Sequence, residues 1–319
     1  MHTPPQRGFW LPPPPDFVGP SVRRWFCMKK LLAVLSVLLS LALATSYPLV
    51  VTDDLGRQVT IPAEPQRIVV MLPSASETIC SIGACNKIVA TDSYSNWPPE
   101  LAKKPKAGGL YDPNVELIAS FKPDLVIVSK FGKLAGALEK LGIRVFAMDT
   151  ETYEDIFRSA RDLGRLLNRE PQAERLIASI NSQVYQLQTK VAKVSTRPSV
   201  YYEIDATPYT VGPASFIGTL IGKAGGSNII PAKLGLFPKI SPELVVEKDP
   251  EVILLGDAPY GVSAEKIKER PGWAKLRAVK NGRVCELTKE QTDVVHRPGP
   301  RVAQGLAVLI HCIHPELGQ

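Results

Sequence analysis

The sequence has none of the short motifs that mark the common nucleotide-binding and hydrolytic enzymes. It contains no G-x-x-x-x-G-K-[ST] loop, no G-x-G-x-x-G between a strand and a helix, and no G-x-S-x-G turn. Histidine is scarce: there are four in 319 residues, and His311 and His314 lack a carboxylate pair that would complete a metal site. No C-x-x-C pair supports a structural zinc site. We therefore expect no enzymatic activity, no catalytic residue, no cofactor and no bound metal.

A strong net charge is also missing from most of the chain. The formal charge is +7, but residues 1–44 hold five bases and one acid. The remainder then has 33 basic and 30 acidic residues, a charge of +3. No basic stripe interleaved with aromatic residues remains, so nucleic acid is not an expected partner.

Long apolar runs are absent except near the N-terminus. Lys29-Lys30 precede a 14-residue apolar run, residues 31–44, which ends in Ala42-Leu43-Ala44. These three features are typical of a secretory signal peptide, and the run is shorter than the roughly 20 residues of a transmembrane helix. A buried core helix is the alternative, but it leaves the basic front and the small-residue end unexplained. We expect cleavage near Thr45.

Residues 1–27 have a different character, being rich in proline and without a periodic pattern. We expect translation to start at Met28, with a disordered extension as the alternative. Cys27 precedes the apolar run, so it cannot be the lipid-bearing cysteine that follows a lipoprotein signal. The mature protein is therefore expected to be secreted through a cleaved signal peptide into the periplasm or cell envelope, without a lipid anchor.

Four cysteines follow the expected signal, and an oxidising compartment allows them to form disulfides. Cys80 and Cys85 would close a short loop at a helix end, and Cys285 and Cys312 would join a late strand to the last helix. Four cysteines allow three pairings, and free buried thiols are the alternative.

Strands and helices alternate through residues 45–152. Leu125–Val128 is continuously apolar, as is typical of a strand buried on both faces of a parallel sheet. Ser74 is the expected N-cap of the first helix, with Glu77 completing a capping box and Gly83 ending the helix. The other expected elements are a hairpin at 49–61, strands at 67–72, 87–91 and 144–148, and helices at 115–121 and 134–141. This order predicts a parallel α/β layered fold.

Residues 153–196 are helical almost throughout. Pro171 interrupts the pattern at a position that suits the first turn of a new helix, and apolar residues then recur at helical spacing to Val191. Alternation resumes in residues 197–319, with strands expected at 199–204, 251–255 and 283–287, and helices at 216–223, 243–247 and from about 300. The sequence therefore predicts two α/β halves separated by a long helix.

Aromatic residues recur in the loops and helix starts of both halves. They are Tyr94, Trp97 and Tyr111 in the first half, and Tyr209, Phe216, Phe237 and Tyr260 in the second. Ligands of open α/β sheets bind beyond the carboxyl ends of the strands, where such rings can stack on a ligand. Ordinary packing is the alternative for each. Gly225-Gly226-Ser227-Asn228 ends a helical run, which favours a helix C-cap over a phosphate cradle.

Several segments together resemble the metal-chelate and vitamin B12 type of periplasmic solute-binding protein of ABC importers, class III with a helical backbone. The matching segments are 67–70 with 73–77, 94–99, 122–126, 225–228, 271–273, 276–284 and 299–301. The resemblance runs from about Val50 to the last helix. It implies two Rossmann-like lobes joined by a single long α-helix, and a monomer that delivers a small ligand to an ABC permease dimer with its ATPase subunits.

The resemblance also implies site residues. Glu116 and Glu243, one in each lobe, would dock on arginines of the permease; ordinary helix-start carboxylates are the alternative. The segment 289–300 departs from the family as a loop that carries His296 and Arg297. The residues expected to contact the ligand are Pro73, Ser74, Tyr94, Trp97, Tyr111, Phe216, Phe237, His296 and Arg297. The expected ligand is a corrinoid, with a ferric siderophore or haem as the alternative; a chelatase-like α/β enzyme and a surface receptor are more distant readings.

Overall fold

The computed structural model describes residues 46–318. The predicted signal peptide, the cleavage point near Thr45 and the start at Met28 lie outside these residues. Among the helices of the described part, none combines the length and the apolar character that a membrane crossing requires.

The N-terminal lobe is built on a four-stranded parallel sheet with strand order β4-β3-β5-β6. Its strands are β3 (Ile68–Val70), β4 (Ile88–Thr91), β5 (Leu125–Ser129) and β6 (Val145–Met148), preceded by the antiparallel hairpin β1 (Leu49–Thr52) and β2 (Gln58–Ile61). Its helices are α2 (Pro73–Ser81), α3 (Pro99–Ala102), α4 (Val115–Ser120) and α5 (Leu134–Glu139), with the 3₁₀ turn η1 (Cys85–Lys87). Leu125 and Ile127 pack into one core and Val126 and Val128 into another, which explains the continuously apolar sequence of β5.

The C-terminal lobe contains a five-stranded sheet with order β11-β10-β7-β8, and β9 also pairs with β7. Its strands are β7 (Ser199–Asp205), β8 (Tyr209–Thr210), β9 (Ser227–Asn228), β10 (Val252–Leu255) and β11 (Val284–Glu286). Its helices are α8 (Phe216–Lys223), α9 (Pro242–Lys248), α10 (Ala264–Lys268), α11 (Arg277–Lys280), α12 (Lys289–His296) and α13 (Val302–Ile313), with 3₁₀ turns η2 (Ala232–Leu234), η3 (Ala258–Tyr260), η4 (Trp273–Lys275) and η5 (Pro315–Gly318). The strand pairs β7–β10 and β10–β11 are parallel, as predicted, and β8 adds an antiparallel edge.

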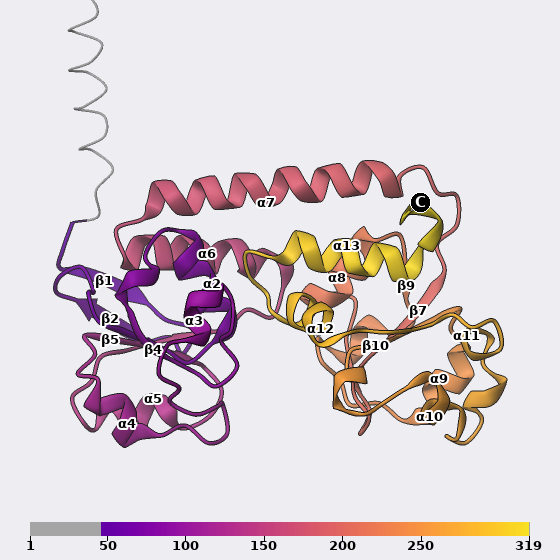
Figure 1. The fold of residues 1–319 in the computed structure, drawn as a ribbon, viewed down its shortest axis with the longest axis horizontal. Coiled ribbons are helices and arrows are strands. Elements are labelled where there is room, and N and C mark those ends of the chain that lie inside the picture. The colour runs from indigo at the N-terminus through magenta and orange to yellow at the C-terminus, as the bar shows by residue number, and fades with distance from the viewer. Residues whose placement is uncertain (1–45, 319) are drawn as a thin grey trace, which may run out of the picture. The chain divides into compact units, whose positions relative to one another are not determined.

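Two helices connect the lobes, as Figure 1 shows. In α6 (Tyr153–Leu166), Tyr153 packs in the core of the C-terminal lobe and Leu163 in that of the N-terminal lobe. In α7 (Glu170–Val191), Ala173 packs in the core of the N-terminal lobe and Ile180 in that of the C-terminal lobe. Pro171 occupies the first turn of α7, as expected. The long helix predicted between the halves is α7, and α6 packs beside it, so each lobe buries part of both helices.

Two local predictions were wrong. The N-cap of α2 is Leu72, which makes no side-chain cap, and Pro73 is the first helical residue, so Ser74 and Glu77 do not form a capping box. The segment predicted as a loop at 289–300 begins with α12, because Thr288 accepts a hydrogen bond from the Gln291 backbone and the Gln291 side chain accepts one in return. Both differences place charged side chains where the two lobes meet.

Disulfides join Cys80 to Cys85, at the end of α2, and Cys285 to Cys312, between β11 and α13. Gly225 follows the end of α8 with φ of 82°, which a side chain rarely adopts. This geometry is that of a helix C-cap, as the sequence indicated.

Candidate functional site

A pocket of about 430 Å³ lies where β7 ends. Tyr111 lines it from the N-terminal lobe, and the C-terminal lobe supplies Ile204, Asp205, Tyr209, Phe216, Ile217, Phe237 and His296. This size is within the range of small-molecule sites, and the position beyond the carboxyl end of a parallel strand is the usual one for α/β sheets. Within the described part of the chain, no lysine or arginine lines this pocket.

The aromatic wall of the pocket depends on a close crossing of two loops. Ser215 caps α8 by accepting a hydrogen bond from Gly218 N at 3.0 Å, so Phe216 is the first residue of the helix. A Cβ atom on Gly212 would collide with the carbonyl oxygen of Gly235, so only glycine allows the loop 235–240 to pass this close. The crossing brings the ring of Phe237 to 6.1 Å from that of Phe216.

His296, the last residue of α12, forms an uncharged part of the wall. Its Nε2 atom lies 2.9 Å from the Tyr202 hydroxyl, and burial lowers the pKa of His296 to about 4. Burial also raises the pKa of Tyr202, so both partners are neutral at pH 7. Gly256 leaves room for this pair, because a Cβ atom there would approach His296 Nε2 to 2.7 Å.

Two further predicted aromatics lie on the loop that follows β4 and do not line this pocket. Tyr94 is 61% exposed and Trp97 is 44% exposed. The carboxylate of Asp92 shapes the loop by accepting hydrogen bonds from Tyr94 N at 2.7 Å and Ser95 N at 3.1 Å. We call residues 94–97 the rim loop.

Four of the predicted ligand contacts therefore meet around one pocket: Tyr111, Phe216, Phe237 and His296. Pro73 and Ser74 lie half-buried in the first turn of α2, outside the pocket lining. The expected ligand contacts did not include four lining residues, Ile204, Asp205, Tyr209 and Ile217, although Tyr209 was among the loop aromatics. Ile204 and Asp205 could have been found, because they are the last residues of an expected strand, where ligands of α/β sheets bind.

Arg297, which was also predicted as a ligand contact, is not among the residues that line this pocket. Its guanidinium donates hydrogen bonds to Glu77 at 2.8 Å, to the Asn96 side chain at 2.7 Å and to the Tyr94 carbonyl at 3.0 Å. The side chain is 8% exposed and is buried among these partners. Its positive charge is matched by carboxylates of the protein itself.

The two predicted docking carboxylates, Glu116 and Glu243, are exposed in the first turns of α4 and α9. Asn114 caps α4 and Ser241 caps α9 through hydrogen bonds to backbone N–H groups. Neither glutamate forms an ion pair with a residue of the described chain. Figure 1 shows α4 and α9 on the side away from α7.

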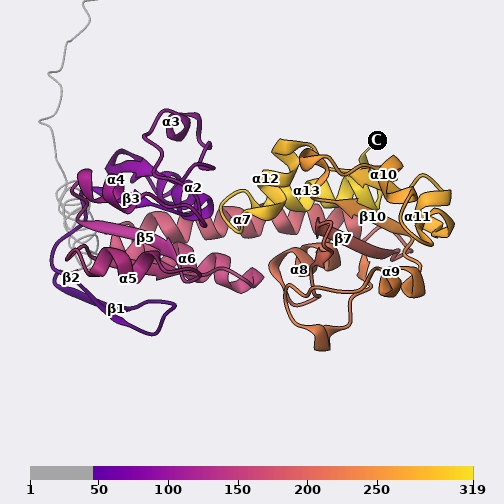
Figure 2. The same ribbon diagram turned by 90° about the horizontal axis from the view of Figure 1, so that it is seen from below.

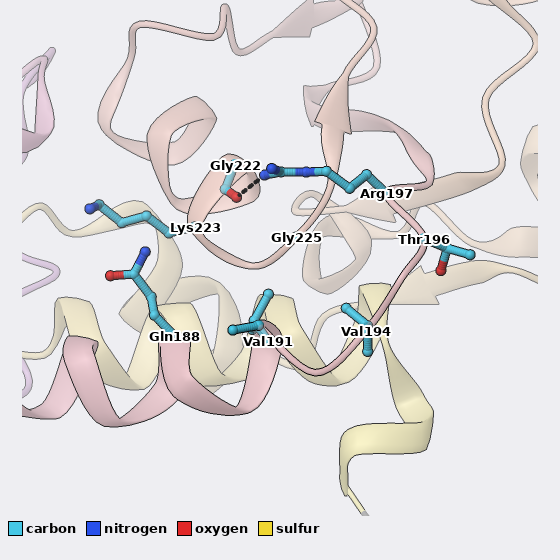
Figure 3. A pocket seen from close by; sticks show the side chains of 9 residues that line it. Gln188, Val191, Val194, Thr196, Arg197, Gly222, Lys223 and Gly225 are labelled. Atoms are coloured by element: carbon cyan, nitrogen blue, oxygen red, sulfur yellow. Dashed lines mark hydrogen bonds between the residues drawn. The ribbon is translucent and has the colours of Figure 1, made fainter.

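A second cavity, of about 280 Å³, lies between the end of α7 and the end of α8 (Figure 3). Arg197 donates a hydrogen bond to the Gly222 carbonyl at 2.9 Å beside it, and the Lys223 ammonium lies 4.6 Å from the Tyr153 ring centroid. No predicted ligand contact and no aromatic side chain lines this cavity. The candidate site is therefore the pocket at the end of β7.

Among residues 46–318, one group of side chains has the spacing of metal ligands: Cys80, Cys85 and Glu100. The two sulfur atoms are joined in a disulfide, so neither is a thiolate that could bind a metal ion.

The architecture defines a class of protein: two α/β lobes, bridged by packed helices, with an aromatic pocket at the strand ends. The sequence pattern of the periplasmic binding protein family matches residues 68–291, so the chain belongs to that family. At this level the chain is a solute-binding component of an ABC transporter, and the family consists of binding proteins for transport. Its relatives place it outside the cytoplasmic membrane.

Individual relatives differ in what they are said to bind. An uncharacterised ABC transporter substrate-binding lipoprotein of Bacillus subtilis is 29% identical over 280 residues, covering 85% of this chain and 87% of that protein. A cobalamin-binding protein of Halobacterium salinarum is 27% identical over 284 residues, covering 85% and 75%. The crystal structure of a possible iron-binding periplasmic solute-binding protein from Staphylococcus epidermidis is 26% identical with a TM-score of 0.69, covering 79% of this chain and 100% of that one.

Proposed function

We propose that the chain captures a corrinoid between its lobes and delivers it to an ABC permease. The observation that supports this ligand most is the lining of the pocket, to which the described residues contribute four tyrosine and phenylalanine rings and no cationic side chain. A corrinoid has apolar faces and a fringe of neutral amides, which suit aromatic rings and hydroxyl groups. The relative from Halobacterium salinarum, which is named as a cobalamin-binding protein, supports the same class of ligand.

Charge argues against the anionic alternatives. Haem propionates and many ferric siderophores carry negative charge, which cationic side chains would be needed to match. The pocket instead contains Asp205, whose pKa is lowered by hydrogen bonds from Thr207, so its carboxylate is ionised at pH 7. Arg297 directly follows the pocket residue His296 in the sequence, but its charge is already matched by Glu77 and Asp293.

A ferric siderophore or haem remains the second candidate, because phenol and imidazole groups are iron ligands. Tyr111, Tyr209 and His296 all line the pocket. The described residues offer no group of metal-binding side chains in this pocket that would favour a chelatase.

Direct binding to the mature protein tests these ligands. Purified protein is titrated with cyanocobalamin, haemin and a ferric hydroxamate in turn, and binding is followed by calorimetry and by the absorption spectrum. We expect cyanocobalamin to bind with one-to-one stoichiometry and the other two to bind at least tenfold more weakly. Tight binding of haemin or the hydroxamate without binding of cyanocobalamin would replace the corrinoid by an iron chelate.

We further propose the interactions of the chain in its compartment. Glu116 and Glu243 dock on cationic side chains of the permease, since both are exposed and have no partner within the described residues. The mature protein is a monomer with lobes at 45–152 and 197–319, joined by residues 153–196. We propose that it carries no lipid anchor; the four cysteines of the described part all lie in disulfides.

A further inference from the structure

A buried group of charged and polar side chains joins the two lobes directly after the pocket residue His296. Glu77 on α2 and Asn96 on the rim loop belong to the N-terminal lobe, whereas Asp293, Arg297 and Arg301 belong to α12 and the start of α13. We call these five residues the interlobe cluster. Figure 2 shows the connection between α12 and α13 on the side of the C-terminal lobe that faces α2. None of the five lines the pocket.

Glu77 is the centre of the cluster, and its side chain is 1% exposed. One carboxylate oxygen accepts hydrogen bonds from Arg297 Nη1 at 2.8 Å and Arg301 Nη2 at 2.6 Å. The other oxygen accepts one from Arg301 Nε at 2.8 Å, which completes a two-pronged contact with that guanidinium. A carboxylate of the N-terminal lobe is thus bound entirely by arginines of the C-terminal lobe.

A second set of bonds connects the same arginine to the rim loop. Arg297 donates to the Tyr94 carbonyl at 3.0 Å and to the Asn96 side chain at 2.7 Å. The Asn96 amide in turn donates to Asp293 at 3.1 Å, and Asp293 lies 2.9 Å from Arg297 Nη2. Arg301 also lies over the Trp97 ring, with its guanidinium carbon 5.2 Å from the ring centroid. The C-terminal lobe therefore holds both ends of a loop that carries two exposed aromatic residues.

The charges of the cluster balance only when the lobes are together. Glu77 and Asp293 offset Arg297 and Arg301, and the two arginine side chains are 8% and 13% exposed. Lys289 pairs with Asp293 from the solvent side, with its side chain 51% exposed. Buried ions are stable only with partners in good geometry, and loss of one partner leaves an uncompensated charge. An increase in lobe separation would therefore leave Glu77 without its arginine partners and leave Arg297 and Arg301 with an excess positive charge.

The backbone reinforces the ion pairs. Arg297 and Arg301 are separated by Pro298-Gly299-Pro300, whose prolines restrict the backbone. Gly299 lies against the first turn of α2, where an added Cβ atom would be 3.3 Å from the Ser74 carbonyl oxygen. The segment between the two arginines is thus held close to the N-terminal lobe by its own main chain.

We propose that the interlobe cluster is a latch, which sets the separation of the lobes before ligand binds and holds the rim loop in its binding position. The inference rests on the proposed function, because a preset rim matters for capture of a ligand between the lobes. The five residues act by positioning other groups. A preset cleft loses less conformational freedom when the ligand binds, so the latch raises affinity without touching the ligand.

The test measures lobe separation without ligand and affinity with it. Nitroxide labels are placed on Lys103→Cys and Lys275→Cys, two exposed positions in different lobes, with both native disulfides formed. Pulsed electron spin resonance should give a narrow distance distribution for the otherwise native protein. In Glu77→Gln, which keeps the shape of the side chain but removes its charge, we expect a broader distribution centred at longer distance. Cyanocobalamin affinity should fall about tenfold, because fewer molecules are latched.

Two further variants separate positioning from loss of stability. Glu64→Gln breaks the ion pair with Lys87, whose side chain is 5% exposed, and a longer one with Arg169 at 3.8 Å, neither of which involves the interlobe cluster. This control should destabilise the protein without changing the label distances. Arg301→Gln added to Glu77→Gln replaces the mismatched charges by two amides and should return the distribution partly to its original width.

The label distances are measured without ligand, so they test the latch whatever the natural ligand is. An unchanged distance distribution in folded Glu77→Gln overturns the latch, and so does an equal broadening in Glu64→Gln. If cyanocobalamin fails to bind to the native protein, the proposed ligand is wrong, but the distances measured without ligand still decide the latch.

Discussion

The two lobes share a parallel α/β plan but contribute unequally to the pocket. Seven of the described lining residues come from the C-terminal lobe, whereas the N-terminal lobe contributes Tyr111, which is 96% exposed. In the C-terminal lobe, the Gly212 crossing folds the loops inward against Phe216. In the N-terminal lobe, the rim loop remains exposed and is held by Asp92 and Arg297. The same topology thus produces a wall in one lobe and a rim in the other, because the loops at the strand ends pack differently.

The lobes also differ in the hydrogen-bond partners that they provide for a buried carboxylate at a strand end. Asp92, just after β4, accepts hydrogen bonds from two backbone N–H groups and the Ser95 hydroxyl. Asp257, after β10, is 4% exposed, and neither carboxylate oxygen has a hydrogen-bond donor within the described chain. Burial and the neighbouring Glu203 carboxylate raise the pKa of Asp257 to about 7. Burial raises the pKa of Asp92 as well, despite its hydrogen bonds. We expect the larger pH response in the C-terminal lobe, because Glu203 adds to the effect of burial on Asp257.

The disulfides provide the largest expected contrast between the lobes. Cys285 and Cys312 are 27 residues apart in sequence, and Cys80 and Cys85 are 5 apart. Because a longer closed loop restricts the unfolded chain more, replacing both cysteines by serine should cost about 3.5 kcal/mol in the C-terminal lobe and about 2 kcal/mol in the N-terminal lobe. Urea unfolding of the two double variants measures both values. An equal or reversed order would show that native-state contacts outweigh loop length.

The next effect is the pH dependence of the C-terminal lobe. The pKa of Asp257 is raised from 3.8 to about 7, so the unfolded chain loses this proton first as pH rises. The contribution of this group to the free energy of unfolding should therefore fall between about pH 4 and about pH 7, by on the order of 4 kcal/mol, and then level off. Arg270, which donates to Glu203 at 2.6 Å, and the Tyr201 hydroxyl, also near Glu203, are the other polar groups facing the pair.

Asp257→Asn isolates this contribution. His296 has the opposite dependence, because its pKa is lowered from 6.5 to about 4 and its neutral form is buried, so stability rises through that range. The variant keeps the histidine and loses the aspartate, so its stability relative to the native protein should increase from pH 4 to pH 7. Parallel stability curves for the two proteins would mean that Asp257 is ionised in the fold.

Ligand affinity should respond more to the wall than to the rim. Phe237→Ala removes a half-buried ring of the wall and should weaken cyanocobalamin binding by about 2 kcal/mol, or roughly 30-fold. Tyr111→Ala removes a ring that is 96% exposed in the free protein, and the loss should be under about 1 kcal/mol. Calorimetry of both variants compares the lobes directly. A greater loss from Tyr111→Ala would assign the main binding surface to the N-terminal lobe.

The smallest change in ligand affinity is expected at Glu116 and Glu243, the carboxylates proposed to dock on the permease. Glu116→Ala and Glu243→Ala should each leave cyanocobalamin affinity within about twofold, since neither lines the pocket. Binding to the permease should weaken, by up to roughly 2–5 kcal/mol if the charge pair is buried and less at a rim, and it should depend on salt. Glu247→Ala is the control, because Glu247 lies on α9 too but already pairs with Lys248 at 2.9 Å. A loss of ligand affinity with intact permease binding would move these glutamates to the pocket.

Local sequence patterns were sufficient where one segment contains its own determinants. The apolar run at β5, the glycine C-cap after α8 and the proline in the first turn of α7 each indicated an element that the structure contains. Periodicity works here because burial of one face, or of both faces, leaves a trace within the segment itself. The capping-box signal at Thr288 and Gln291 was present in the same way, and it could have predicted α12.

Tertiary structure decided the role of each polar residue at the lobe interface. The spacing of Ser74 and Glu77 is that of a capping box, yet Glu77 binds Arg297 and Arg301, more than 200 residues away in sequence. A local pattern contains no information about a charge so distant along the chain. The sequence by itself determined the alternation of elements, the long helix between the halves and the presence of loop aromatics. Only the fold decided which aromatics meet in a pocket and which charges are buried, because both depend on how separate segments pack.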